Sequence, residues 1–97
     1  MRNEMRLIHP GEILQDELAE LNLSANALAQ ALGVPPNRIT AILREQRGIT
    51  ADTALRLARY FGTTPEFWMN LQMAYELRKA EVDSGREIAN SVQPRAA

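Results

Sequence analysis

The sequence predicts an all-α fold in which five helices pack into one domain. Apolar residues recur three and four positions apart over five segments, and proline, glycine, serine, threonine or asparagine separates these segments at positions that start or stop helices. No segment shows the alternation of apolar and polar residues that is typical of a strand. A chain of 97 residues, 45% hydrophobic and 24% charged, has the composition of a single domain. We expect this domain to span residues 1–83, with a short C-terminal tail, residues 84–97, that is partly helical or frayed.

The first two predicted helices have clear start and stop signals. Pro10 suits the first turn of a helix, and Asn22 can end that helix. Ser24 is a good N-cap for the second helix, and Gly33 can adopt the left-handed conformation that ends it. The residues expected to face inward are Ile13, Leu14, Leu18 and Leu21 in the first helix, and Leu28, Ala29 and Leu32 in the second.

Three more helices follow. Pro35 and Pro36 open a third helix that reaches Arg44, because proline is tolerated where the amide has no helical acceptor. Thr50 caps a fourth helix that ends at Gly62, and the run Thr64–Glu66 starts a fifth that reaches about Glu81. The apolar residues expected inward are Ile39, Ile42 and Leu43 in the third helix, and Ala54, Leu55, Ala58 and Phe61 in the fourth. Phe67, Trp68, Leu71 and Tyr75 share one face of the fifth helix, which either packs on the core or serves in part as a dimer interface.

Several classes of function are excluded by what the sequence lacks. There are no cysteines, which removes thiolate metal sites and cysteine nucleophiles and fits a reducing compartment. His9 is the only histidine, so there is no histidine pair for a metal and no base for a catalytic triad; we expect it to cap the first helix. We predict a chain without catalytic residues, metal or cofactor. No apolar run approaches the roughly 20 residues of a membrane helix, and no apolar signal core follows Met1–Arg6, so we expect a soluble, cytoplasmic protein.

Charge is unevenly distributed along the chain, although the net charge is only −1. Residues 1–21 contain five acids against Arg2 and Arg6, whereas residues 22–64 contain five arginines against Glu45 and Asp52. A phosphate-binding face is therefore expected in the centre of the chain, and the acidic ends could meet a basic partner. The alternative is that a local excess of three positive charges arose by chance. The five central arginines are Arg38, Arg44, Arg47, Arg56 and Arg59.

The join between the second and third predicted helices has the pattern of a helix-turn-helix. This motif requires a small residue where the two helices cross, a glycine at the turn and apolar residues at fixed offsets beneath. Ala29 and Gly33 occupy the first two positions, and the apolar positions are held by Leu28, Leu32, Val34, Ile39 and Ile42. Each of these residues alone could simply belong to a core. Together they predict a motif whose second helix enters the major groove of DNA.

The order of the helices and several short runs resemble known repressors. A five-helix chain with the motif in its second and third helices resembles the Cro and phage-repressor (XRE) family, which implies a lambda-repressor-like DNA-binding domain. Residues 9–14 (HPGEIL), 32–34 (LGV), 54–58 (ALRLA) and 64–72 (TPEFWMNLQ) resemble the HigA antitoxins of type II toxin–antitoxin modules, also called the VapI group. The resemblance covers roughly residues 6–81. It implies a homodimer that represses its own operon at a palindromic operator and neutralises a HigB toxin, a RelE-like ribonuclease that cleaves messenger RNA.

The candidate DNA contacts lie mainly on the third predicted helix. Asn37 and Arg38 can reach base edges, because asparagine pairs well with adenine and arginine with guanine. Related repressors usually have serine or threonine at the position of Pro35 and polar readers at those of Pro36 and Ala41, so base contacts are expected to shift onto Arg38 and Thr40. The full set on this helix is Pro36, Asn37, Arg38, Thr40, Ala41 and Arg44; phosphate contacts are expected from Arg44, Gln46, Arg47, Gly48, Ser24 and Asn26.

Other functions remain open at this point. The chain could be a regulator of the same fold without a toxin partner, or a protein-only inhibitor in which the motif is structural; an enzyme is the least favoured reading. Asp16, Glu17 and Glu20 form an acidic helix face that is either solvated or contacts a basic toxin. We expect toxin and DNA to use different surfaces.

Overall fold

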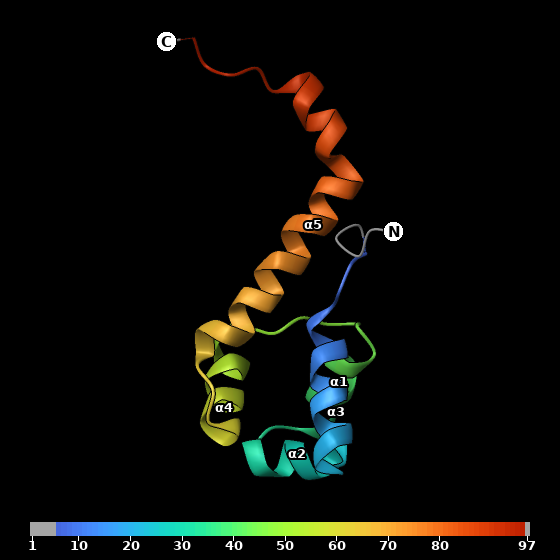
Figure 1. Cartoon of the computed structure of the whole chain (residues 1–97), viewed down its shortest axis with the longest axis vertical. Helices are drawn as coiled ribbons and strands as arrows, with labels where there is room; N and C mark the ends of the chain where they lie inside the picture. Colours follow the sequence, from blue (N-terminus) through green and yellow to red (C-terminus); the bar gives the residue numbers. More distant parts are fainter. Residues whose placement is uncertain (1–5, 97) are drawn as a thin grey trace.

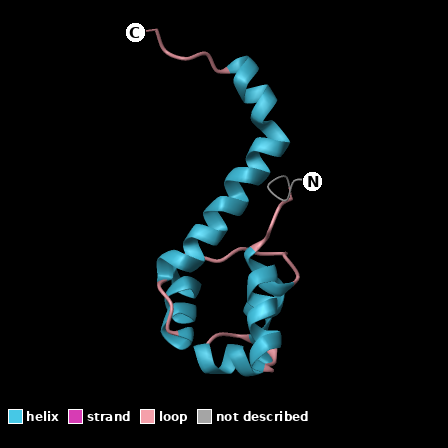
Figure 2. Cartoon of the chain, in the orientation of Figure 1, coloured by secondary structure: helices cyan, strands magenta, loops and turns pink. Residues whose placement is uncertain are grey.

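The computed structural model describes residues 6–96 and contains five helices and no strand within that range (Figures 1 and 2). This confirms the predicted all-α class. The helices are α1 (Pro10–Leu21), α2 (Ala25–Leu32), α3 (Pro36–Leu43), α4 (Ala51–Phe61) and α5 (Pro65–Ser91). None of the helices in the described range has the length and apolar character needed to cross a membrane.

Helices α1 to α4 form a compact body, and α5 extends from it (Figure 1). Contacts join α2 to α3, α1 to α3 and α2 to α4, while the first part of α5 packs against α4 and α1. The rest of α5 projects beyond the body and gives the molecule its length of 52 Å. The two helices of the predicted motif therefore sit at the end of the molecule opposite the tip of α5 (Figure 1).

The core lies between the four short helices and is closed by the start of α5. Trp68 of α5 is buried, and its indole Nε1–H donates a hydrogen bond of 2.9 Å to Thr63 Oγ1. Burying an indole together with its partner removes a large apolar area from water and leaves no orphaned donor. The other core residues are Leu14, Leu18, Leu28, Ala29, Leu32, Val34, Ile39, Ile42, Ile49, Ala54, Leu57 and Ala58.

Local signals in the sequence define all five helix starts and most of the helix ends as predicted. His9 begins α1, because its Nδ1 accepts a 2.9 Å hydrogen bond from the Gly11 N–H. The hydroxyls of Ser24, Thr50 and Thr64 cap α2, α4 and α5 by accepting from the backbone three residues ahead. Left-handed residues end the first, second and fourth helices, and these are Asn22, Gly33 and Gly62.

The expected end of the last helix, near Glu81, is wrong. Helix α5 is 27 residues long and continues through Gly85 to Ser91. A glycine in a helix costs only about 1 kcal/mol relative to alanine, and the ion pair between Lys79 and Asp83, at 2.6 Å, lies just before it. The helix thus crosses the expected domain boundary without a break, and the division at residue 83 stays a prediction.

Some residues expected to face inward are exposed. Leu55 is 60% exposed, and the buried leucine of α4 is Leu57. Successive residues rotate by about 100° around a helix, so Leu55 falls beyond the face that carries Ala54 and Ala58. Leu21 is likewise exposed, at 52%, and Phe67, for which a dimer interface was the alternative to the core, is 43% exposed. The spacing of apolar residues identified the helices correctly and assigned the edges of their buried faces wrongly.

Candidate nucleic-acid interface

Helices α2 and α3 form the predicted helix-turn-helix. Gly33 adopts a left-handed φ of 71°, and the Val34 N–H donates to the Ala29 carbonyl at 3.0 Å, so the turn closes directly on α2. Ala29 is fully buried, as a small residue at the crossing of two helices must be. Ile39 and Ile42 are also fully buried and hold α3 down on the core. The opposite face of α3 therefore points away from the core.

Helix α1 contacts α3 closely and helps to position it. A Cβ atom on Gly11 would lie 2.1 Å from the carbonyl oxygen of Ile42, so the start of α1 and the end of α3 approach backbone to backbone. No side chain larger than hydrogen fits between them without movement. Gly11 lies in the HPGEIL run, and its lack of a side chain lets the start of α1 pack directly on the end of α3.

The predicted contact residues differ in their exposure. Ser24, Asn26, Pro36, Asn37, Arg44, Gln46 and Arg47 are exposed, whereas Arg38, Thr40, Ala41 and Gly48 are half-buried. Ser24 and Leu43 line the same surface pocket of about 450 Å³, which brings the start of α2 beside the end of α3. The Thr40 hydroxyl donates to the Asn37 carbonyl at 3.4 Å and so turns back on its own helix.

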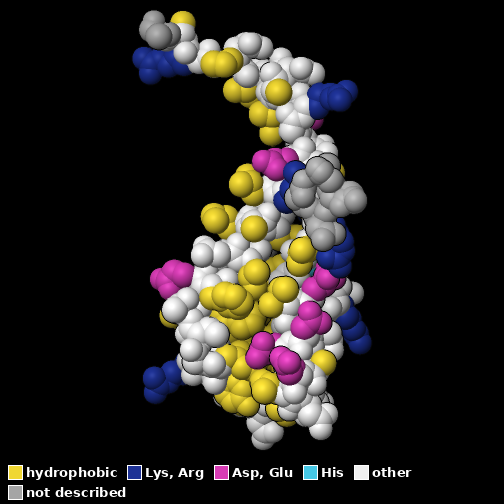
Figure 3. Space-filling view, viewed as in Figure 1, with side chains coloured by type: hydrophobic (Ala, Val, Ile, Leu, Met, Phe, Trp, Pro, Cys, Tyr) yellow, Lys and Arg dark blue, Asp and Glu magenta, His cyan; other side chains and the backbone are white. Residues whose placement is uncertain are grey.

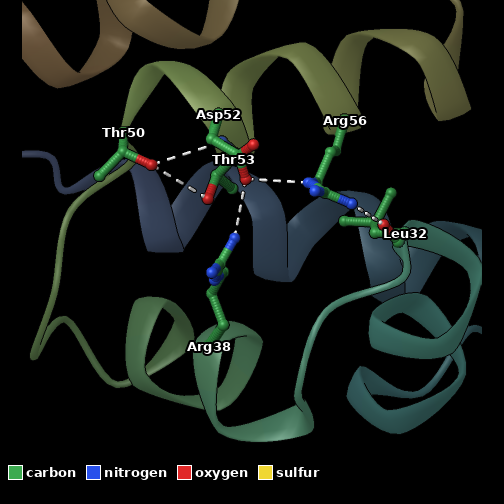
Figure 4. A network of polar contacts seen from close by, with 6 residues as sticks. All are labelled: Leu32, Arg38, Thr50, Asp52, Thr53 and Arg56. Atoms are coloured by element: carbon green, nitrogen blue, oxygen red, sulfur yellow. Dashed lines mark hydrogen bonds and ion pairs between the residues drawn. The ribbon is translucent and has the colours of Figure 1, made fainter.

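Arg38 is directed toward α4 instead of standing free (Figure 4). Its Nη1 donates to Asp52 Oδ2 at 2.9 Å, and the side chain is 28% exposed. The same carboxylate oxygen accepts from Arg56 Nε at 2.8 Å, and Arg56 Nη1 donates to the Leu32 carbonyl at 2.8 Å. One carboxylate thus joins α3 and α4, and Arg56 extends the link to the end of α2.

Neither Asp52 nor Arg56 is among the predicted site residues. Their spacing of four along a helix is a recognised signal for an ion pair, although the pairing with Arg38 across 14 residues leaves no such signal. The hydrogen bond from Arg56 is the main cause that lowers the pKa of the Asp52 carboxyl below its ordinary value, and Arg38 adds to it. Asp52 is therefore ionised at neutral pH and balances part of the local positive charge.

The remaining central arginines are differently placed. Among the residues that the structure describes, Arg44, Arg47 and Arg59 form no ion pair. Arg44 and Arg47 flank the turn after α3, where Glu45 has a φ of 62°. This turn is held from the other side by α5, because the Ile49 N–H donates to Gln72 Oε1 at 2.7 Å. Arg44 and Arg47 therefore present two exposed guanidinium groups beside a loop whose backbone is held by Gln72.

The fold and this surface define a helix-turn-helix domain, and comparison with known proteins identifies its family. The Helix-turn-helix family model matches residues 14–68. Virulence-associated protein I of Dichelobacter nodosus is 63% identical over 83 residues, which are 84% of this chain and 77% of that protein. The chain belongs to the helix-turn-helix family and, within it, to the group of the HigA antitoxins.

Two solved structures are close to this one. A HigA-family antidote protein from Coxiella burnetii is 59% identical, with a TM-score of 0.90 over 93% of this chain and 99% of its own. The antitoxin HigA of Pseudomonas aeruginosa, solved with the higBA promoter, is 51% identical, with a TM-score of 0.91 over 94% of this chain and 100% of its own. This is a family of DNA-binding regulators, so the chain is not an enzyme.

Proposed function

We propose that this chain is a sequence-specific DNA-binding antitoxin that represses its own toxin–antitoxin operon and neutralises a HigB-like toxin. The observation that carries the proposal is the outward face of α3, with Asn37 exposed on a helix that Gly11 and the buried Ile39 and Ile42 hold in place. The HigA relative solved with promoter DNA, which has nearly the same fold, supports it. The chain then acts in the bacterial cytoplasm, where it binds its operator on the nucleoid.

The DNA contacts divide by chemistry. Asn37, Arg38 and Thr40 are proposed to read base edges, with Pro36 and Ala41 beside them on α3, because these side chains face the groove in a docked helix-turn-helix. Arg44, Gln46 and Arg47 are proposed to bind phosphate from the turn after α3, and Ser24 and Asn26 from the start of α2. The Ser24 hydroxyl accepts from Ala27 N–H at 3.0 Å, and its own proton remains available to a phosphate oxygen.

This division can be tested with two arginine variants. Arg38→Ala should weaken binding to the operator by about 1–3 kcal/mol and relax the preference at one position in each half-site. Arg47→Ala should weaken binding to all sequences alike and flatten the dependence on salt. Fluorescence anisotropy on operator and scrambled duplexes at several salt concentrations measures both. Equal losses on both duplexes for Arg38→Ala would make Arg38 a phosphate contact.

A homodimer on a palindromic operator is the second part of the proposal. One helix-turn-helix reads only a few base pairs, so two copies with recognition helices about 34 Å apart are needed for affinity. Helix α5 offers apolar surface for such an interface, since Met73 and Leu77, four residues apart, share one exposed face of it. Figure 3 shows hydrophobic side chains along α5 beyond the body. An exposed apolar stripe of this kind is typical of a protein interface.

Sedimentation velocity at micromolar concentration tests the dimer. Leu77→Glu should produce monomers, because it places a charge in the stripe. Val82→Glu is the matched control, since Val82 is as exposed as Leu77 and lies on the opposite side of α5. A wild-type chain that stays monomeric both free and on operator DNA would contradict the dimer.

The toxin is proposed to bind the acidic regions instead of the DNA-reading face. Acidic side chains gather over α1 in Figure 3, and Asp16 and Glu20 are exposed there. A RelE-like nuclease must be basic to hold RNA, so opposite potentials favour its encounter with α1 or the C-terminal part. The toxin-bound chain should then still occupy its operator.

Rescue from the toxin tests this arrangement. The protein is co-expressed with the product of the neighbouring reading frame, and four changes are compared: charge reversal at Asp16, Glu17 and Glu20, truncation after Asp83, Arg38→Ala and Arg44→Ala. We expect one of the first two to abolish rescue while operator binding persists. If both rescue fully and a folded Arg44→Ala or Arg38→Ala variant does not, the toxin contacts the DNA-reading face. A wild-type chain that binds operator and rescues from no neighbouring product is an XRE-type regulator without a toxin partner.

A further inference from the structure

The carboxylate of Asp52 is the one acidic group that contacts a proposed base reader among the described residues. It lies in the first turn of α4, 57% exposed, and holds Arg38 and Arg56 on a single oxygen atom. Figure 4 shows the Arg38 side chain rising from α3 toward this carboxylate, with Arg56 approaching from the other side. Arg56 is anchored in turn on the Leu32 carbonyl at 2.8 Å, so the carboxylate has a fixed position relative to the turn of the motif.

The contact uses only part of the Arg38 guanidinium. A guanidinium group has five N–H donors in a planar fork, and Asp52 takes one from Nη1. The edge formed by Nε and Nη2 makes no hydrogen bond within residues 6–96, and such an edge can donate two parallel bonds to the O6 and N7 atoms of guanine. The ion pair thus leaves the reading edge available while it restricts how the side chain can turn.

The same contact changes what Arg38 can do with phosphate. A flexible, uncompensated arginine binds any backbone phosphate, and each phosphate neutralised adds to affinity without regard to sequence. An arginine whose charge is balanced by a carboxylate gains less from a phosphate and loses less conformational freedom when it meets a base. Because the pKa of the Asp52 carboxyl is lowered, the carboxyl is ionised at neutral pH and compensates the charge of Arg38 there.

We propose that Asp52 is a specificity-determining positioning residue, which orients Arg38 for base reading and suppresses its binding to phosphate. The inference rests on the proposed DNA-binding function and adds a residue that lies outside the reading helix. Loss of the carboxylate should raise affinity for DNA in general and lower the discrimination between sequences.

The experiment uses Asp52→Asn, which keeps the shape of the side chain and removes its charge. The probes are a duplex selected by the wild-type chain from a randomised pool and a scrambled duplex of the same composition. The discrimination ratio is the dissociation constant for the scrambled duplex divided by that for the selected duplex. For Asp52→Asn we expect this ratio to fall about tenfold, within the range that one bidentate arginine–guanine contact supplies. On the scrambled duplex, the slope of log K against log salt should steepen by about one, as for one added phosphate contact.

Asp83→Asn is the matched control. Asp83 is 53% exposed and pairs with Lys79 four residues away on the outer part of α5, so the change in net charge is the same and an ion pair between residues four apart is lost, as it is between Asp52 and Arg56. The ratio and the salt slope should remain those of the wild type. Circular dichroism confirms that each variant is folded at the temperature of the assay.

A double-mutant cycle with Arg38→Ala separates positioning from a merely structural role. If Asp52 acts through Arg38, Asp52→Asn has no further effect on the ratio when Arg38 is already absent. An unchanged ratio in the wild-type background, or an equal fall in both backgrounds, overturns the proposal. If the wild-type chain selects no sequence, the proposed function itself fails; if it does select one and Asp52→Asn keeps the same ratio and salt slope, only the role of Asp52 fails.

Discussion

Replacing Gly11 with alanine should destabilise the protein, although helix propensity alone argues for the opposite. The added Cβ would lie 2.1 Å from the Ile42 carbonyl oxygen, whereas carbon–oxygen contacts are normally about 3.3 Å or longer. Helix α1 or α3 must therefore move by roughly 1 Å. Both groups in the clash belong to the backbone, so rotation of a side chain cannot relieve it.

The magnitude follows from two opposing effects. Overpacking a tight site costs about 1–3 kcal/mol, and a clash between two backbones falls at the upper end of that range. Alanine gains about 1 kcal/mol over glycine in a helix. We expect a net loss of about 2 kcal/mol for Gly11→Ala, which lowers the melting temperature of a domain of this size by roughly 10 °C.

Urea and thermal unfolding, followed by circular dichroism at equal protein concentration, measure this loss. Gly85→Ala is the matched control, because Gly85 lies inside α5 and its added Cβ would meet nothing closer than Glu81 Cβ at 3.9 Å. That variant should gain about 0.5–1 kcal/mol. If Gly11→Ala is as stable as the wild type while Gly85→Ala shows its gain, the close approach of α1 and α3 does not constrain the fold.

Three further predictions concern the core, the turn after α3 and the charge network. Leu28→Ala should cost about 2–5 kcal/mol in urea unfolding because Leu28 is fully buried, whereas exposed Leu21→Ala should cost less than about 1 kcal/mol; similar losses would refute the assigned burial. Gln72→Ala should cost about 1–3 kcal/mol by leaving the Ile49 N–H without its acceptor. Gly48→Ala should also destabilise, since its Cβ would lie 2.5 Å from Gln72 Nε2, and the double variant should lose less than the sum of the two; strict additivity would show that the residues do not interact. Arg56→Gln should raise the pKa of Asp52 toward its ordinary value in an NMR titration of the carboxyl carbons, because Arg56 is its main stabilising partner; an unmoved midpoint would contradict the network. The lowered pKa implies that the contribution of Asp52 to stability is complete above the ordinary aspartate pKa of about 4 and is lost as the pH falls through the lowered value.

The helices and their boundaries could be predicted where the signal lies within a few residues. The caps at His9, Ser24, Thr50 and Thr64 and the left-handed ends at Gly33 and Gly62 are set by contacts between near neighbours in the chain. The end of α5 was not predictable in this way. Gly85 ends a helix only when the residues after it cannot continue that helix. In this chain the residues after Gly85 continue α5 as far as Ser91.

The candidate site was predictable in outline, because a helix-turn-helix is itself a local motif. The pattern from Leu28 to Ile42 indicated which helix faces outward and which residues it carries. It could not indicate that Arg38 is paired, since Asp52 belongs to another helix, and an ion pair between helices depends on how those helices pack.

Three things could be predicted from the sequence, namely the class of the fold, the position of the motif and the candidate DNA contacts, because each depends on periodicity and caps over one or two turns of helix. Three other features arise only from the packing of the helices: the approach of Gly11 to Ile42, the support of the Gly48 turn by Gln72, and the charge balance on Arg38. These contacts join residues 14 or more positions apart. Their geometry follows from the packing of whole helices around the core, which no local pattern of residues specifies.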